Sequence, residues 1–433
     1  MSPTKDHISY QQSKRDRPPK PKPTNPIEEA VKTWLSRLPI ELQENIKLGV
    51  GRLMPLTPKR WVVYPPMVLL PPGSFGEEWW AILGSEISPE TMDELWRLLL
   101  GSISKREGKG TLTHLAINSG IPLNKATDHQ TGLNSGVGAV TLKSENILRV
   151  PCGLITLYGD FGPSLPPENT LRSTDFEEAF WVSTKQNGIT QVWAPRYTMF
   201  SRGNVKEKAR ILDFHNNANG IARARSVAEE ELIAASAVDL YAGIGYFVFS
   251  YVKMGIKQVI GWELNPWSVE GLRRGAIANG WSVKVVQGGD VSKSFDEKIV
   301  VFSEDNVEAA ARLRGMDSSE AGKIMHVNCG LLPTSEMTWE MAIHILRGDG
   351  WLHLHENVGV DDIQTRKAEI QQMLETWLTK VHDNRIVRIE HVEMVKTFAP
   401  GVWHCVFDVN VTGAEDRFPD AQCANPESAA VFC

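Results

Sequence analysis

The stretch DLYAGIGYF, residues 239–247, sets the fold class of this chain. Residues 235–243 form an apolar run that predicts a buried strand, and Gly243 and Gly245 follow where that strand would turn into a helix. A tight glycine turn at this point lets the backbone approach a bound ligand closely. Position 248 is valine, so the GxGxxG pattern of dinucleotide-binding turns is incomplete and a pyrophosphate site is disfavoured. Taken alone, the turn also fits an ordinary strand-to-helix connection.

Strands and helices alternate after this turn. Further strands are predicted at 258–263, 282–290, 323–329 and 350–358, with helices at about 246–254, 266–279, 335–346 and 361–381. Two β-rich runs, 384–396 and 402–411, flank the turn FAPG and predict an antiparallel hairpin. The alternation indicates an α/β, Rossmann-like, mostly parallel sheet with ligands above the carboxyl ends of its strands. With its closing antiparallel hairpin, the plan resembles that of class I methyltransferases.

Carboxylates stand at the ends of three predicted strands, at Asp239, Glu263 and Asp290. At the end of the second strand, the carboxylate of Glu263 can accept hydrogen bonds from both ribose hydroxyls of a nucleoside. Asp290 could bond an adenine amino group. Because no phosphate-binding turn accompanies them, these acids predict S-adenosylmethionine as the ligand. The alternative is that they only cap the helices that follow.

The N-terminal half predicts a smaller α+β region. Helices should begin at Asn25-Pro26 and Ser88-Pro89, where a capping residue precedes a proline at the first helical position. Residues 60–72 are strand-like, and residues 146–162 suggest a pair of strands. The predicted organisation is a tail over 1–24, the α+β region over 25–190, an S-adenosylmethionine-binding domain over 191–411 and a second tail over 412–433.

Composition narrows the class of protein. The chain has 433 residues, 42% hydrophobic and 23% charged, which is typical of a soluble globular protein of two or three domains. Its 5 cysteines fit no zinc-ligand spacing, which favours reduced thiols in the cytosol. We find no apolar segment of the signal-peptide type and no apolar run as long as a membrane span. A cytoplasmic protein without a membrane partner is therefore expected.

The net charge of −6 does not indicate a nucleic-acid binder, but a basic face can coexist with an acidic remainder. The tail contains SKRDRPPKPKP, residues 13–23, whose prolines predict an extended disordered segment. It is either a plain leader or a loose electrostatic tether for RNA. A second basic segment, residues 194–211, is either a solvated helix or a site for a methionine carboxylate or an RNA phosphate.

Four motifs occur in a fixed order along the chain: YTMFSRGNVKEKAR, DLYAGIGYF, WELNPWSVEGLRRG and LLPTSEMTWEMA with GWLHLHENV. Together they resemble the fungal type of the tRNA wybutosine-synthesizing protein 2 family. That family is related to the tRNA guanine N1-methyltransferase that acts beside the anticodon. The resemblance is strong over about 190–411 and looser over 27–180, and it implies that the α+β region over 25–190 binds tRNA. The segment 211–234 is longer than the family norm.

The resemblance implies a reaction and a set of site residues. The 3-amino-3-carboxypropyl group of S-adenosylmethionine would move to carbon C7 of 4-demethylwyosine in phenylalanine tRNA, next to the anticodon, with release of methylthioadenosine. Ser201 and Lys208 match the family pattern FSxGNxxEK and would hold the donor, with Arg202 on the substrate side. The full set of expected cofactor-binding residues is Ser201, Lys208, Asp239, Gly243, Gly245, Glu263 and Asp290.

The loop Gly330-Leu331-Leu332-Pro333 stands where amino-directed methyltransferases carry (Asn/Asp)-Pro-Pro. An apolar wall made by Leu331, Leu332 and Pro333 suits a tricyclic base that needs stacking area. It also suits a carbon nucleophile, which has no N–H to orient. The loop therefore speaks against the closest alternative, guanine N1-methylation on the same scaffold.

The sequence does not assign a proton acceptor. His355 or Glu356 could serve, or both could be strand-end hydrogen-bonding groups. His353-x-His355 lacks a third ligand, so no metal is predicted. A non-catalytic tRNA-binding protein remains a further alternative, and a monomer is the favoured state.

Overall fold

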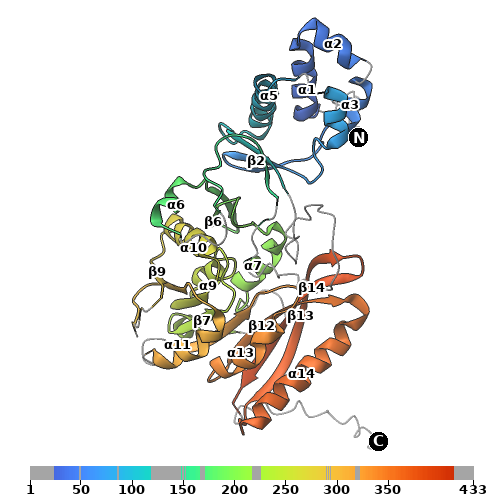
Figure 1. Ribbon diagram of the computed structural model, residues 1–433. Coiled ribbons are helices and arrows are strands. Elements are labelled where there is room, and N and C mark those ends of the chain that lie inside the picture. Colours follow the sequence, from blue (N-terminus) through green and yellow to red (C-terminus); the bar gives the residue numbers. More distant parts are fainter. Residues whose placement is uncertain are drawn as a thin grey trace, which may run out of the picture. The chain divides into compact units, whose positions relative to one another are not determined.

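The computed structural model describes residues 24–47, 50–84, 87–118, 148, 151, 153–165, 171–216, 226–288, 290, 292, 294–316 and 322–413. The chain divides into two compact units, one of residues 1–61 with 73–113 and one of residues 62–72 with 114–433 (Figure 1). The predicted tails over 1–24 and 412–433 fall outside the described residues, apart from Thr24 and residues 412–413. The predicted boundary near residue 190 stays a prediction.

The first unit is built from helices: α1 (Pro26–Arg37), α2 (Ile40–Lys47), α3 (Val50–Leu56), α4 (Glu77–Leu83) and α5 (Pro89–Glu107). The side chain of Asn25 caps α1 by accepting from Ile27 N at 2.9 Å, and Ser88 caps α5, so both predicted helix starts are confirmed. Trp34 is fully buried where α1 packs on α5. None of the helices in the described part of the chain is long and apolar enough to span a bilayer.

The second unit begins with a sheet in the order β1-β2-β3-β4, made of β1 (Val62–Tyr64), β2 (Met67–Leu70), β3 (His114–Ile117) and β4 (Ile155–Tyr158). A helix, α6 (Ser173–Glu178), and the hairpin of β5 (Val182–Gln186) and β6 (Ile189–Trp193) follow. Tyr64 packs edge-on against Trp193 with ring centres 4.8 Å apart, and Trp193 stacks on Phe200 at 4.7 Å. These rings support the loop that leads to α7. Of the strand pair predicted over 146–162, the described residues contain only β4.

An eight-stranded sheet forms the centre of the second unit, in the order β13-β14-β12-β11-β7-β8-β10-β9. Its strands are β7 (Ala235–Asp239), β8 (Gln258–Trp262), β9 (Val283–Val286), β10 (Ile299–Phe302), β11 (Lys323–Cys329), β12 (Gly350–Gly359), β13 (Ile386–Ala399) and β14 (Val402–Thr412). β14 runs antiparallel to β12 and β13, between which it lies, and all other neighbouring strands are parallel. The predicted methyltransferase-like sheet with a closing hairpin is confirmed.

Helices cover both faces of this sheet (Figure 1). One face packs on α7 (Val205–Leu212), α9 (Val248–Met254) and α10 (Pro266–Ala278), and the other on α11 (Ala309–Gly315), α13 (Trp339–Ile345) and α14 (Ile363–Lys380). The remaining short elements are α8 (Glu229–Leu232), η1 (Arg202–Asn204), η3 (Asn306–Glu308), η4 (Glu336–Thr338) and η5 (Val360–Asp362). Strands buried on both faces explain the continuous apolar runs in the sequence.

The prediction of a single strand between β8 and β11 is wrong. Two strands lie there, and β10 pairs with β8, so β9 is displaced to the edge of the sheet. The missed strand is the run Ile299–Phe302, whose four side chains are all buried. A short run buried on both faces shows no alternation of polar and apolar residues, which is the usual mark of a strand. The correction matters because the residues that follow β10, not those that follow β9, line the cavity at this edge of the sheet.

Candidate active site

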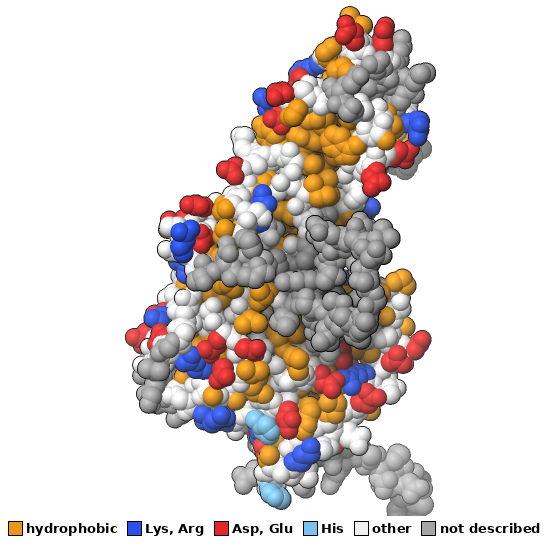
Figure 2. Space-filling model, in the orientation of Figure 1, with side chains coloured by type: hydrophobic (Ala, Val, Ile, Leu, Met, Phe, Trp, Pro, Cys, Tyr) orange, Lys and Arg blue, Asp and Glu red, His pale blue; other side chains and the backbone are white. Residues whose placement is uncertain are grey.

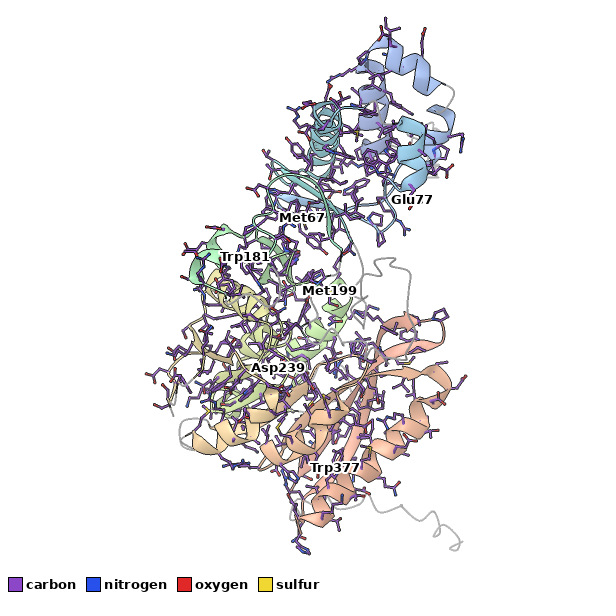
Figure 3. The ribbon with its side chains drawn as sticks, in the orientation of Figure 1. Met67, Glu77, Trp181, Met199, Asp239 and Trp377 are labelled. Carbon is purple, nitrogen blue, oxygen red and sulfur yellow. The ribbon has the colours of Figure 1, made fainter. Side chains whose placement is uncertain are left out.

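A cavity of about 330 Å³ lies at the carboxyl ends of β7, β8 and β10. Its walls come from the loop 198–204, the turn 240–247, the segments 262–268 and 304–306, and the loop 330–332. Met199, which lines the cavity, and Asp239, which ends β7, are labelled in Figure 3. Most of the sequence motifs singled out above therefore meet at one place.

The glycine turn has two functions. Gly243 (φ +54°) lines the cavity, so a left-handed backbone conformation that favours glycine is adopted at the ligand space itself. Gly245 (φ +89°) is not among the lining residues. A side chain there would meet the ring of Phe249 at 2.5 Å, so this glycine allows α9 to pack closely on the turn.

Glu263 follows β8 and lines the cavity as predicted. Its Oε2 accepts from Gly243 N at 2.8 Å and its Oε1 accepts from Asn265 N at 2.8 Å. Burial raises the pKa of Glu263 to about 7, partly offset by these backbone bonds and reinforced by the charge of Asp239. No cation pairs with this carboxylate among the ion pairs of the described residues. It therefore offers lone pairs and negative charge to a ligand.

Asp239 is completely buried under the turn and does not line the cavity. Its Oδ1 accepts from Asn328 Nδ2 and from Tyr241 N, both at 3.1 Å. Its Oδ2 and the Oδ1 of Asn328 have no hydrogen-bond partner within the part of the chain that is described. Burial raises the pKa of Asp239 to about 6. Two carboxylates without a cation make this end of the sheet favourable for a positively charged ligand.

Asp290 lies on the segment after β9 and is not a lining residue. Its carboxylate accepts from Ser292 and faces Lys284 at 3.7 Å. Two other acids, Glu304 and Asp305, reach the cavity from the segment after β10, and the amide of Asn306 lies beside them. Sequence reasoning missed them because β10 itself was missed. The apolar run 299–302 directly before SEDN was the available signal.

The loop after β11 forms the apolar wall that was predicted. Leu331 and Leu332 are half-buried and line the cavity, whereas Pro333 is exposed and does not. Two exposed apolar side chains, Leu264 and Met337, also reach the cavity, with 41% and 82% of their surface accessible. Exposed apolar groups at the edge of a pocket suit the flat face of a large base.

The loop before α7 forms the opposite part of the wall. Ser201 and Asn204 line the cavity, and Tyr246 fixes this loop, because its hydroxyl donates to Met199 O at 2.6 Å and accepts from Ser201 N at 3.0 Å. Arg202 is exposed. Nearby, Lys396 of β13 donates to Ser201 Oγ at 3.3 Å. Sequence analysis did not single out Lys396, which lies far away along the chain.

Lys208, predicted to hold the donor, is almost fully buried and is not a lining residue. Its ammonium donates to Gln186 Oε1 and Gln191 Oε1, both at 2.7 Å, and burial lowers its pKa to about 8. Arg210 is buried in ion pairs with Glu207 and Asp408. The interpretation of this segment as a solvated helix is therefore wrong, because two of its cations are bound inside the protein.

His355 and Glu356 do not line the cavity. His355 is buried, with its Nδ1 3.0 Å from His404 Nε2, and Glu356 forms an ion pair with Arg366 at 2.8 Å. We therefore assign neither a proton-transfer role. Among the described residues, no group of three or more His, Cys, Asp or Glu side chains could hold a metal ion.

Comparison with known proteins supplies the family. No family model matches the chain. The chain is 41% identical over 357 residues to tRNA wybutosine-synthesizing protein 2 of Schizosaccharomyces pombe. The aligned region covers 81% of this chain and 72% of that protein. The protein of the same name from Saccharomyces cerevisiae is 33% identical over 409 residues, covering 85% and 77%. This chain belongs to the tRNA wybutosine-synthesizing protein 2 family.

Among solved structures, a proposed transferase from Pyrococcus horikoshii matches with a TM-score of 0.50 at 17% identity, over 89% of this chain and 99% of that one. At that identity the match shows the fold alone. Membership in the tRNA wybutosine-synthesizing protein 2 family confirms the resemblance drawn from the four motifs. All four motifs supply cavity walls in the structure: the loop 198–204, the turn after β7, the segment after β8 and the loop after β11.

Proposed function

We infer that the protein is an S-adenosylmethionine-dependent transferase of wybutosine biosynthesis. It moves the 3-amino-3-carboxypropyl group to carbon C7 of 4-demethylwyosine in tRNA and releases methylthioadenosine. The observation that carries this proposal is the shared cavity of Glu263, the Gly243 turn and the apolar pair Leu331 and Leu332. The cavity combines a carboxylate that can bind a nucleoside with an apolar wall. Such a wall suits a base that reacts through carbon, because no N–H group of that base has to be oriented.

The cavity suggests where each part of the donor lies. Glu263 accepts from the ribose hydroxyls, and Asp305 or Asn306 bonds the adenine edge, in place of Asp290. The negative charges of Asp239 and Glu263 stabilise the sulfonium. The base then lies against Leu331 and Leu332.

The reaction exchanges one bond for another at the γ-carbon of the donor's tail. The ring carbon of the base forms a bond to this γ-carbon, and the bond from the γ-carbon to sulfur breaks. Sulfur keeps the electron pair and becomes the neutral thioether of methylthioadenosine. The ring carbon then loses its proton to water or to a base, which restores the aromatic system. The protein contributes by placing the γ-carbon, rather than the methyl group, in line with the base.

We propose phenylalanine tRNA as the acceptor, a monomer as the active form and the cytoplasm as the compartment. Arg202 is exposed beside the cavity and is a candidate for a tRNA phosphate. On the face in Figure 2, Lys and Arg side chains are interspersed with Asp and Glu over the described residues. A single exposed cation beside the cavity can bind a phosphate even though the net charge of the chain is negative.

The by-product tests the proposal. The protein is incubated with S-adenosylmethionine and tRNA that carries 4-demethylwyosine, and both products are resolved by mass spectrometry. We expect methylthioadenosine in step with a tRNA base that gains the aminocarboxypropyl mass. S-adenosylhomocysteine with a methylated guanine would establish the methyltransferase alternative, and neither product with tRNA still bound would establish a binding protein.

A further inference from the structure

Behind the wall of the cavity at Ser201 lies a cation without an anion, Lys396, which is not itself a lining residue. Lys396 donates to Ser201 Oγ at 3.3 Å, and no ion pair of the described residues includes it. Its cross-strand neighbour on β14 is His404, whose pKa falls to about 4 because of burial and, secondarily, the charge of Lys396. His404 is therefore neutral at physiological pH. Burial also lowers the pKa of Lys396, as expected for an ammonium that lacks a counter-ion.

The same wall holds an acceptor without a donor. Asn204 lines the cavity, and its Oδ1 is buried with no hydrogen-bond partner within the described part of the chain. A buried carbonyl oxygen without a partner is destabilising unless a ligand supplies the missing N–H. Asn204 belongs to η1, the same short helix as Arg202 and Gly203, and follows Ser201 closely. The acceptor Asn204 thus lies on the same short segment that the cation Lys396 contacts from β13.

Gly203 makes this arrangement possible. A β-carbon at this position would lie 2.5 Å from Cδ and 2.7 Å from Nζ of Lys396. The lysine side chain therefore crosses directly over the glycine to reach Ser201. When Lys396 donates to Ser201 Oγ, the serine hydroxyl keeps its own hydrogen and can donate it into the cavity.

The unpaired groups match the two charges of a free amino-acid end. We propose that Ser201, Lys396 and Asn204 bind the zwitterionic end of the donor's tail. Ser201 donates to the carboxylate, Lys396 supplies the compensating positive charge behind it, and Asn204 Oδ1 accepts from the ammonium. This inference rests on the proposed function and goes further, because it assigns the tail to a segment of η1 and the terminal hairpin instead of to Lys208.

Three ligands separate the contributions of these groups. S-adenosylmethionine has both charges of the tail, decarboxylated S-adenosylmethionine keeps only the ammonium, and methylthioadenosine has neither. Binding of each is measured by titration calorimetry. We expect Lys396→Met to weaken S-adenosylmethionine at least tenfold, with the other two ligands unchanged. Asn204→Leu should weaken both ligands that carry the ammonium and leave methylthioadenosine unchanged.

Two matched variants test position as distinct from charge. Lys396→Arg keeps the cation and should restore part of the affinity for S-adenosylmethionine. Gly203→Ala keeps the whole polar set, and the 3₁₀ backbone of η1 accepts alanine, but the new methyl group displaces the lysine. It should therefore reproduce the ligand selectivity of Lys396→Met in a smaller degree.

The outcomes distinguish the inference from the proposed function. Equal weakening of all three ligands by Lys396→Met would show a structural role and overturn the inference, and so would unchanged affinity for S-adenosylmethionine. In both cases the wild-type protein still forms methylthioadenosine, so the proposed function stands. Wild-type protein that binds none of the three ligands would overturn the proposed function and, with it, this inference.

Discussion

Two groups of buried polar side chains in the second unit differ in how completely they are paired. The first runs from α7 across three strands. Arg210 forms ion pairs with Glu207 and Asp408, and Asp408 Oδ1 lies 2.9 Å from His353 Nδ1. His353 Nε2 is in turn 3.0 Å from His326 Nδ1, and His326 Nε2 is 2.9 Å from His215 Nε2. The second lies at the cavity wall or behind it. Asp239, Asn328 and Asn204 each leave one buried oxygen without a partner among the described residues, and of these three only Asn204 lines the cavity.

The first group, which we call the α7 chain, is satisfied internally. Burial lowers the pKa of His326 far below its ordinary value, so this ring is neutral and has one donor and one acceptor, both in use. The arginine beside Asp408 holds the pKa of that carboxyl well below its usual range, against the effect of burial. The paired groups hold α7 on the sheet. Pairing thus distinguishes these two groups, although some buried atoms away from the cavity, such as Tyr251 Oη and His355 Nε2, also lack a partner among the described residues.

The largest expected effect concerns the α7 chain. Asp408→Ala leaves Arg210 with one carboxylate and removes the acceptor of His353, so we expect a loss of about 3–5 kcal/mol in stability. Differential scanning calorimetry measures it as a lower midpoint of thermal unfolding. Donor affinity of the folded fraction should stay unchanged.

Glu393→Ala is the matched control, because this partly exposed residue pairs with His391 on neighbouring β13 and should contribute less than about 1 kcal/mol. If Asp408→Ala unfolds at the same temperature as this control, the α7 chain does not stabilise the fold.

The next effect belongs to the cavity. Glu263→Ala should weaken S-adenosylmethionine binding by at least tenfold, since hydrogen bonds to a charged group contribute about 1.5–3 kcal/mol. Stability should change little, because the loss of the two backbone hydrogen bonds from Gly243 N and Asn265 N is offset by the removal of a buried carboxylate that has no cation. Calorimetric titration and thermal unfolding of the same sample measure both quantities. Unchanged affinity in a folded variant would remove Glu263 from the site.

A pH series sharpens the contrast without removing a side chain. The pKa of Glu263 is raised to about 7, so its carboxylate is mostly protonated at pH 6 and mostly ionised at pH 8. The ionised carboxylate attracts the sulfonium and accepts hydrogen bonds from two ribose hydroxyls. The affinity for S-adenosylmethionine should therefore rise up to about tenfold between pH 6 and pH 8. Glu263→Gln cannot ionise and should flatten most of the rise; Asp239, with a pKa of about 6, accounts for the remainder. A slope equal to that of the wild type would point to another group.

The smallest effect tests the corrected strand order. Asp305→Ala should weaken the donor about three- to fivefold, the effect of one hydrogen bond of about 1 kcal/mol. Asp290→Ala, on the strand displaced to the edge of the sheet, should leave affinity unchanged. The reverse result would restore Asp290 as the residue that binds adenine.

The sequence predicted the parts of the site that depend on local order. Glycines after an apolar run, a carboxylate after the next strand and Leu331-Leu332 after a later one all came to the cavity, because parallel strands end at one edge of the sheet. Spacing alone could not show that β10 enters between β8 and β9. Nor could it show that Lys208 turns inward to two glutamines while Lys396 reaches Ser201. Such contacts depend on tertiary packing, which no single stretch of sequence encodes.

The terminal hairpin has a consequence for the synthesis of this protein. The contact between Ser201 and Lys396 spans 195 residues, and that between Arg210 and Asp408 spans 198. A growing chain therefore displays the glycine turn, Glu263 and the apolar loop long before β13 and β14 exist. Contacts of such sequence separation form late, since the ends of a long loop must first be brought together. Chains that stop short of the hairpin would keep the nucleoside-binding turn yet lack both the anchor of α7 and the cation behind Ser201. The anchor of α7 and the cation behind Ser201 are therefore complete only after the last two strands of the sheet have been synthesised.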